Sequence, residues 1–194
     1  MKRLLGNKAF YSHLLVIVVP ILIQNGITNL VNMLDNIMVG QVGTYPMSGV
    51  SIINQMVFIF NLCLFGGVAG AGIFTAQFFG QGNHEGVRYT FRYKLLIAVV
   101  VDIVAIAIFV LFQDALIGLY LKNGDAAPDP AAAGEILHYA KQYLSVIYFE
   151  MIPFSIAQAY ASTLRESNET MLPMKAGIVA VILNLCLNIL MLSI

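Results

Sequence analysis

Five apolar runs, each long enough to cross a membrane as a helix, constrain this chain more than any other feature of its sequence. They cover residues 11–40, 47–80, 95–120, 136–164 and 172–194. A helix needs about 20 apolar residues to cross the hydrocarbon core, whereas a spanning β-barrel shows alternating segments of about ten residues. The sequence therefore predicts an all-α, polytopic membrane helix bundle with five transmembrane helices, in a single domain over residues 1–194.

Composition agrees with this fold class. Charged residues make up 10% of the chain and its mean hydropathy is +0.83, whereas soluble domains carry about 25% charged residues. The first run is too long for a cleaved signal peptide, so we expect it to stay in the mature protein. We expect a multi-pass protein of the cell membrane, surrounded by the lipid bilayer and without a nucleic-acid partner.

The positive charges predict an orientation. If successive runs alternate in direction, eight Lys and Arg residues fall on one face and two on the other: Lys2, Arg3, Lys8, Arg88, Arg92, Lys94, Arg165 and Lys175 against Lys122 and Lys141. The second face also receives an acidic connection with Asp125, Asp129 and Glu135. Because Lys and Arg are enriched in cytoplasmic loops, the N-terminus is predicted to be cytoplasmic and the C-terminal end of the fifth helix to lie outside.

The first run carries polar residues on one face. At 100° per residue they fall in a sector about 140° wide: Gln24, Asn25, Thr28, Asn29, Asn32, Asp35 and Asn36. Amides and hydroxyls on such a face often hydrogen-bond to a neighbouring helix and need no ligand. A carboxylate in hydrocarbon is expensive, so Asp35 indicates a functional role, such as binding a proton or a small cation. Pro20 lies in the same run, where it is either a hinge or simply a tolerated kink.

Polar residues in the other runs are sparser. Asn184 and Asn188 lie one turn apart on a single face of the last run, and Asn54 lies in the second. Tyr148 and Gln158 share a face of the fourth run. Asp102, two turns beyond Lys94, is interpreted as a structural or interfacial carboxylate.

Glycines in the second run indicate close helix packing. Gly66 and Gly70 are four residues apart, with Gly67 and Ala71 beside them. This small-xxx-small pattern lets helices approach closely in lipid. The spacing of a phosphate-binding loop is absent, so the packing interpretation is favoured.

The order and spacing of these features resemble the multidrug and toxic compound extrusion (MATE) family of cation-coupled antiporters, over almost the whole chain. The resemblance rests on "VPILIQNGITNLVNMLDNIMVGQVG" with Pro20 and Asp35, on "SIINQMVFIFNLCLFGGVAGAGIFTAQFFGQGN", on "ASTLRESNETMLPM" and on the Asn184 pair. It implies the amino-terminal portion of a transporter in which twelve helices form two six-helix lobes around a cleft that opens alternately to each side.

The resemblance implies a role for several residues. Asp35, Asn184 and Asn188 would couple transport to protons or sodium, with Asp35 and Asn184 as the possible sodium ligands. Some members that place an acid at this site have Asp where this chain has Asn188, so the chain offers one ionisable partner fewer. Cavity-lining positions expected to face the substrate are Gln24, Thr28, Asn32, Asn54, Tyr148 and Gln158.

The expected function is secondary active antiport of drugs or metabolites, with a small organic substrate that is cationic and amphipathic. Because five runs are fewer than twelve, the chain is expected to be a partial transporter that lacks the carboxy-terminal lobe. No cofactor other than the coupling ion is expected, and no enzyme motif such as HExxH or GxSxG occurs. Two alternatives stay open. One is a lipid-linked saccharide flippase of the same superfamily, and the other is a non-transporting helical membrane fragment that needs a partner.

Overall fold

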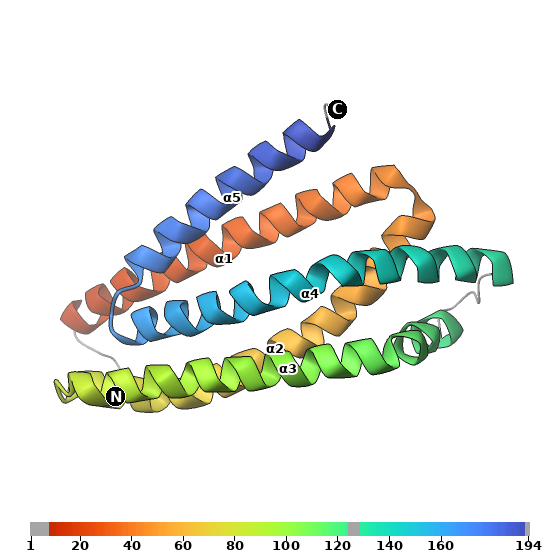
Figure 1. The fold of residues 1–194 in the computed structure, drawn as a ribbon. Helices are drawn as coiled ribbons and strands as arrows, with labels where there is room; N and C mark the ends of the chain where they lie inside the picture. The colour runs from red at the N-terminus through yellow and green to blue at the C-terminus, as the bar shows by residue number, and fades with distance from the viewer. Residues whose placement is uncertain (1–7, 124–128, 193–194) are drawn as a thin grey trace, which may run out of the picture. The chain divides into compact units, whose positions relative to one another are not determined.

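The computed structural model describes residues 8–123 and 129–192, and within them the chain forms five long α-helices (Figure 1). These are α1 (Lys8–Val42), α2 (Thr44–Gly80), α3 (His84–Asn123), α4 (Pro130–Glu166) and α5 (Met171–Leu192). Each contains a stretch long and apolar enough to cross a membrane. The prediction of an all-α membrane bundle is confirmed, and the chain is a multi-pass membrane protein. Lys2, Arg3 and Asp125 lie outside the described residues.

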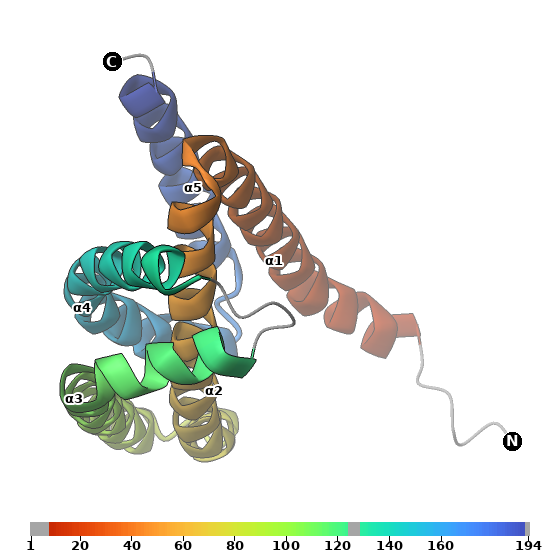
Figure 2. The same cartoon turned by 90° about the vertical axis from the view of Figure 1, so that its right-hand side faces the viewer.

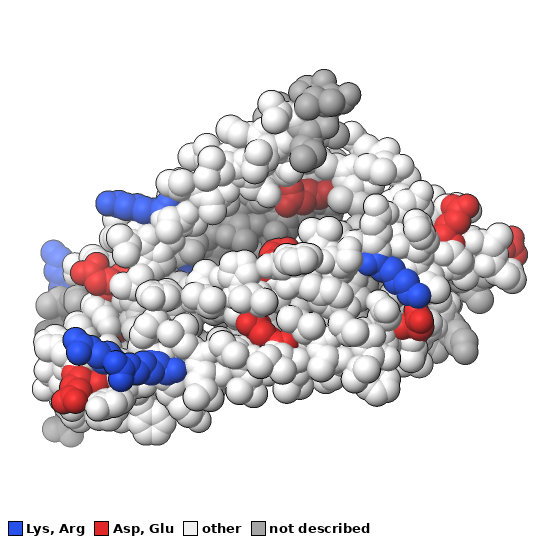
Figure 3. Space-filling view, in the orientation of Figure 1, with Lys and Arg blue, Asp and Glu red and all other residues white. Residues whose placement is uncertain are grey.

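Uncharged side chains form most of the face shown in Figure 3, as expected of helices surrounded by lipid. The helices are also longer than the bilayer requires. α3 has 40 residues, which corresponds to about 60 Å of helix, roughly twice the thickness of the hydrocarbon core. Part of each long helix therefore extends into the interfacial region.

The helix boundaries differ from the apolar runs where polar residues continue a helix. α3 begins at His84 rather than at residue 95. The Oδ1 atom of Asn83 accepts a hydrogen bond from the Gly86 amide at 2.9 Å, and Glu85 lies in the first turn, where a negative charge suits the helix dipole. α4 begins at Pro130 rather than at 136, since proline is well suited to a first helical position. Local capping, which hydropathy does not record, sets both starts.

Two short connections have well-defined backbone geometry. α1 and α2 are separated by Gly43 alone, whose φ of 141° is readily adopted by glycine. α2 ends in a Schellman motif: the Gly82 amide, with φ at 70°, donates to the Phe79 carbonyl, and the Asn83 amide donates to the Phe78 carbonyl. The second turn reverses the chain within a few residues, which makes α2 and α3 antiparallel.

The described chain divides into two compact parts. The α1/α5 part contains α1 up to Asp35 and the chain from Leu164 onward, which includes α5. The α2–α4 part runs from Asn36 to Thr163. In the α1/α5 part, Gln24 contacts Pro173 near the start of α5, and Asp35 contacts Asn188 near its end. These contacts show that α1 and α5 run in the same direction.

The three helices of the α2–α4 part lie beside one another (Figure 2), and all three contribute buried side chains to one apolar core. Buried side chains from α2 include Ile53 and Leu64, which lie in one cluster with Ala98 of α3 and Leu144 of α4. Polar contacts join the same helices: α2 and α3 through the buried Thr75 and Thr90 hydroxyls at 3.0 Å, and α3 and α4 through several side chains described below. The core therefore fixes the register of α2, α3 and α4 against one another.

Close helix approach occurs at one glycine of the predicted small-residue pattern, Gly67, and at Gly49, which lies outside it. Within the described residues, a Cβ on Gly66 or Gly70 would meet nothing within 4 Å, so these two glycines of the predicted small-residue pattern do not contact a neighbouring helix there. A Cβ on the adjacent Gly67 would lie 2.6 Å from Ile97 of α3, and one on Gly49 would lie 2.9 Å from the backbone nitrogen of Ala140 in α4. The small-residue pattern therefore lies in the segment of α2 that approaches α3, but Gly67 makes the approach rather than Gly66.

Candidate functional site

Asp35 lies against two asparagines of α5. The Asn188 amide nitrogen, Nδ2, donates to Oδ1 of Asp35 at 2.7 Å and to Oδ1 of Asn184 at 3.0 Å. Asn184 and Asn188 are one turn apart, so both side chains lie on the face of α5 that meets α1. One amide group thus bridges a carboxylate and an amide oxygen from two parallel helices.

This arrangement concentrates oxygen atoms around a single charge. Asp35 contributes two carboxylate oxygens and Asn184 contributes one amide oxygen, and the Asn188 amide nitrogen donates to both residues. Oxygen ligands of this kind suit hard cations, and a carboxylate can also take up a proton. The Asn188 amide donates a charge-assisted hydrogen bond to the Asp35 carboxylate. The group can therefore hold one small positive ion.

Gln24 has contacts on both sides of its amide. Its Oε1 accepts a hydrogen bond from the Arg165 guanidinium at 2.8 Å, and its Nε2 donates to the Pro173 carbonyl at 3.3 Å. Gly177 lies beside it, because a Cβ there would be 3.0 Å from the same Nε2. Gln24 therefore joins α1 to the last turn of α4 through Arg165 and to the first turn of α5 through Pro173. Sequence reasoning missed Arg165 as its partner.

The remaining α1 candidates have simpler surroundings. Thr28 is exposed and its hydroxyl donates to the Gln24 carbonyl one turn earlier, at 3.0 Å. Asn32 is exposed. Pro20 lies inside α1, which continues as one helix from Lys8 to Val42.

Three candidates belong to the α2–α4 part. Asn54 of α2 accepts a hydrogen bond from the Tyr143 hydroxyl at 3.5 Å, and Gln158 of α4 is half-buried. The Tyr148 hydroxyl is buried and has no hydrogen-bond partner within the described residues. The structure thus brings Asp35, Asn184 and Asn188 together in the α1/α5 part. Asn54, Tyr148 and Gln158 belong to the α2–α4 part instead.

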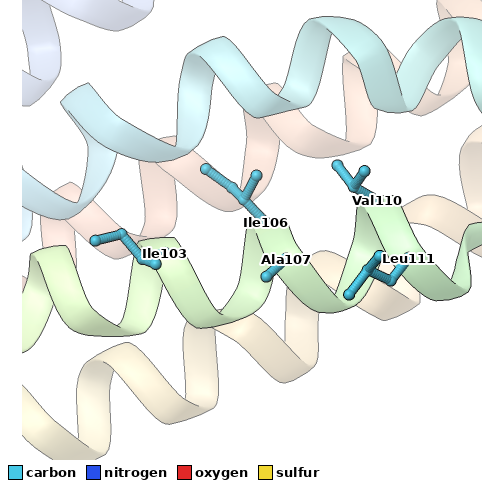
Figure 4. A pocket seen from close by; sticks show the side chains of 5 residues that line it. All are labelled: Ile103, Ile106, Ala107, Val110 and Leu111. Atoms are coloured by element: carbon cyan, nitrogen blue, oxygen red, sulfur yellow. The ribbon is translucent and has the colours of Figure 1, made fainter.

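The α2–α4 part also contains a shallow hollow, but its lining is entirely hydrocarbon. Five α3 side chains form it: Ile103, Ile106, Ala107, Val110 and Leu111 (Figure 4). Such a surface suits acyl chains and offers no group that could orient a polar ligand.

Two buried polar groups of α3 were underestimated from the sequence. Lys94 is fully buried, and its ammonium donates to the hydroxyls of Ser162 at 3.1 Å and Thr163 at 3.3 Å on α4. Asp102, 4% exposed, contacts the Ser155 hydroxyl of α4 at 2.5 Å. Asp102 lies inside the predicted run of residues 95–120, so its position was a signal, whereas Lys94 lies just before that run and its burial became evident only because α3 begins at His84.

Comparison with known proteins gives one family. The MatE family model matches residues 20–190. The chain is also 28% identical, over 163 residues, to a protein of Thermotoga maritima named "Probable multidrug resistance protein NorM". The match covers 84% of this chain and 33% of that relative, so the chain spans about a third of the relative's length. No solved structure matches the chain.

Proposed function

Since the chain belongs to the MatE family, as the match over residues 20–190 shows, we propose that it forms part of a secondary active antiporter that exports drugs or metabolites. The family confirms the resemblance found in the sequence. The name of the Thermotoga maritima relative supports multidrug transport as the activity of the whole polypeptide. The exported substrate is proposed to be a small organic, amphipathic cation. The transporter is proposed to lie in the cell membrane with its N-terminus in the cytoplasm.

We assign the coupling site to Asp35 with Asn184 and Asn188. This assignment rests on the 2.7 Å hydrogen bond that the Asn188 amide donates to the Asp35 carboxylate. A proton or a sodium ion that binds to Asp35 neutralises the carboxylate and weakens its attraction for the Asn188 amide. Ion binding therefore changes the strength of a contact between α1 and α5. That difference between loaded and empty states is the kind of coupling that alternating access requires.

The test uses the longest polypeptide that contains this chain, reconstituted in vesicles. Efflux of a cationic fluorescent dye is driven in one arm by a proton gradient and in the other by a sodium gradient. Asp35→Asn keeps the size of the side chain and removes its charge, so ion-driven efflux should be lost. Glu150→Gln, which removes an exposed carboxylate of α4, is the matched control and should retain efflux. Unchanged efflux with unchanged ion dependence in Asp35→Asn would remove Asp35 from the mechanism.

A further inference from the structure

If Asp102 is ionised, the single hydroxyl hydrogen of the buried Ser155 faces two acceptors, a carboxylate oxygen of Asp102 and the Ile152 carbonyl oxygen. The Ser155 Oγ atom lies 2.5 Å from Oδ2 of Asp102 and 2.9 Å from the carbonyl oxygen of Ile152. A serine hydroxyl has a single hydrogen, and a carbonyl has none to give. A proton on Oδ2 of Asp102 supplies the second hydrogen: the acid then donates to Ser155, and Ser155 donates to Ile152.

Burial favours the same form. Asp102 is 4% exposed and Ser155 is fully buried. The second carboxyl oxygen of Asp102, Oδ1, has no hydrogen-bond partner within residues 8–123 and 129–192. A carboxylate in this position would keep an unsolvated charge next to a single neutral hydroxyl, which is the expensive case for a polar group in a membrane.

The charged and titratable groups on the neighbouring helices do not compensate for such a charge. α2 has no Asp, Glu, Lys, Arg or His between Thr44 and Gly80, and its Cys63 is exposed. On α4, Tyr148 precedes Ser155 by seven residues, and Glu150 is exposed. On α3 itself, Lys94 lies eight residues earlier, about 12 Å along the helix, where its ammonium contacts Ser162 and Thr163.

We propose that Asp102 is a proton-binding carboxylic acid, held neutral within the membrane and hydrogen-bonded through its own proton to Ser155. It is a second proton site, built by α3 and α4, and it does not depend on the role proposed for Asp35. Its ligand is the proton alone, because the Ser155 hydroxyl occupies one oxygen and the surrounding core is apolar.

The test is infrared spectroscopy of the full chain in lipid vesicles at neutral pH, with ¹³C in the aspartate carboxyl groups. Asp35→Asn serves as the background, so that any proton on Asp35 does not contribute. We expect one labelled, protonated-carboxyl band in this background and its complete loss when Asp102→Asn is added. Asp114→Asn, which changes an exposed acid on the same helix, should leave the band unchanged.

A second variant keeps the proposal open to refutation if Asp102→Asn does not fold. Ser155→Ala removes the acceptor of the carboxyl hydrogen, so the band should remain but shift in frequency. The proposal is overturned if the labelled background shows no protonated carboxyl, if the band survives Asp102→Asn, or if Ser155→Ala leaves its frequency unchanged.

Discussion

The Asn188 amide nitrogen lies 2.7 Å from the carboxylate of Asp35, a residue 153 positions earlier in the sequence. The same nitrogen lies 3.0 Å from Oδ1 of Asn184. One side chain of α5 therefore holds two oxygens in place, and Asn188 acts as the organiser of the group rather than as one of several equal ligands. This relationship gives Asn188 a different expected effect on mutation from that of an ordinary polar residue in a membrane helix.

Replacing Asn188 with Ala should weaken ion coupling without abolishing it. The change removes a hydrogen bond to a charged group, which contributes about 1.5–3 kcal/mol. Since about 1.4 kcal/mol corresponds to a factor of ten, the coupling-ion concentration that gives half-maximal dye efflux should change by roughly tenfold or more. Gln55→Ala, an exposed amide of α2, should leave this concentration unchanged. Equal values for the two variants would show that Asn188 does not organise the site.

Gly49→Ala should destabilise the α2–α4 part. The added Cβ would lie 2.9 Å from the Ala140 nitrogen and 3.1 Å from the Ile136 carbonyl oxygen, both of which are backbone atoms of α4 and cannot rotate away. Overpacking of this kind typically costs about 1–3 kcal/mol. The measurement is unfolding in mixed detergent micelles, followed by helical circular dichroism.

Gly66→Ala is the matched control for that change. It lies on the same helix, and no atom of the described part of the chain lies within 4 Å of the added Cβ. Ala forms helices better than Gly by up to about 1 kcal/mol, so this variant should be neutral or slightly more stable. A Gly49→Ala protein as stable as Gly66→Ala would contradict the close approach of α2 and α4.

The helices of this chain could be predicted from its sequence, but the glycines at which they approach one another could not all be predicted. Apolar length predicted the five helices, because the membrane leaves a chain few other ways to satisfy its backbone. The small-residue pattern contained Gly67 but not Gly49, and it did not show that Gly67, rather than Gly66 or Gly70, is the member that meets α3. A small-residue pattern indicates a surface that can pack closely, but the rotation of the helix about its axis is set by tertiary contacts.

Hydrogen-bond partners that are distant in sequence could not be predicted either. A helical face predicted that Asn184 and Asn188 act as a pair, since one turn separates them. Ser155 follows Asp102 by 53 residues, and Arg165 follows Gln24 by 141. Such pairs depend on the register between helices, which spacing within one helix does not contain. Asp102, which was interpreted as a structural or interfacial carboxylate, is buried at an α3–α4 contact, in agreement with a structural position.

Gln24→Ala should loosen the α1/α5 part. The variant loses an acceptor for Arg165 and a donor to the Pro173 carbonyl. Interhelical hydrogen bonds in membrane proteins average about 0.6 kcal/mol and reach about 1.7 kcal/mol, so a loss of about 1–2 kcal/mol is expected for the two together. A double-mutant cycle with Arg165→Ala isolates the pair, and its coupling energy should exceed the error of unfolding in micelles. Additive single effects would show that the two side chains do not interact.

Asp114→Asn should change stability very little, although its carboxylate forms a 2.5 Å ion pair with Lys141. The two side chains are 67% and 39% exposed. Exposed pairs contribute about 0–1 kcal/mol, because water and salt screen the attraction and both side chains lose conformational freedom. Unfolding of Asp114→Asn in mixed micelles should therefore match the unaltered chain at high salt and lie within about 1 kcal/mol of it at low salt. A larger, salt-independent loss would mean that the pair is shielded from water, and that α3 and α4 depend on it as strongly as on the buried Asp102–Ser155 contact.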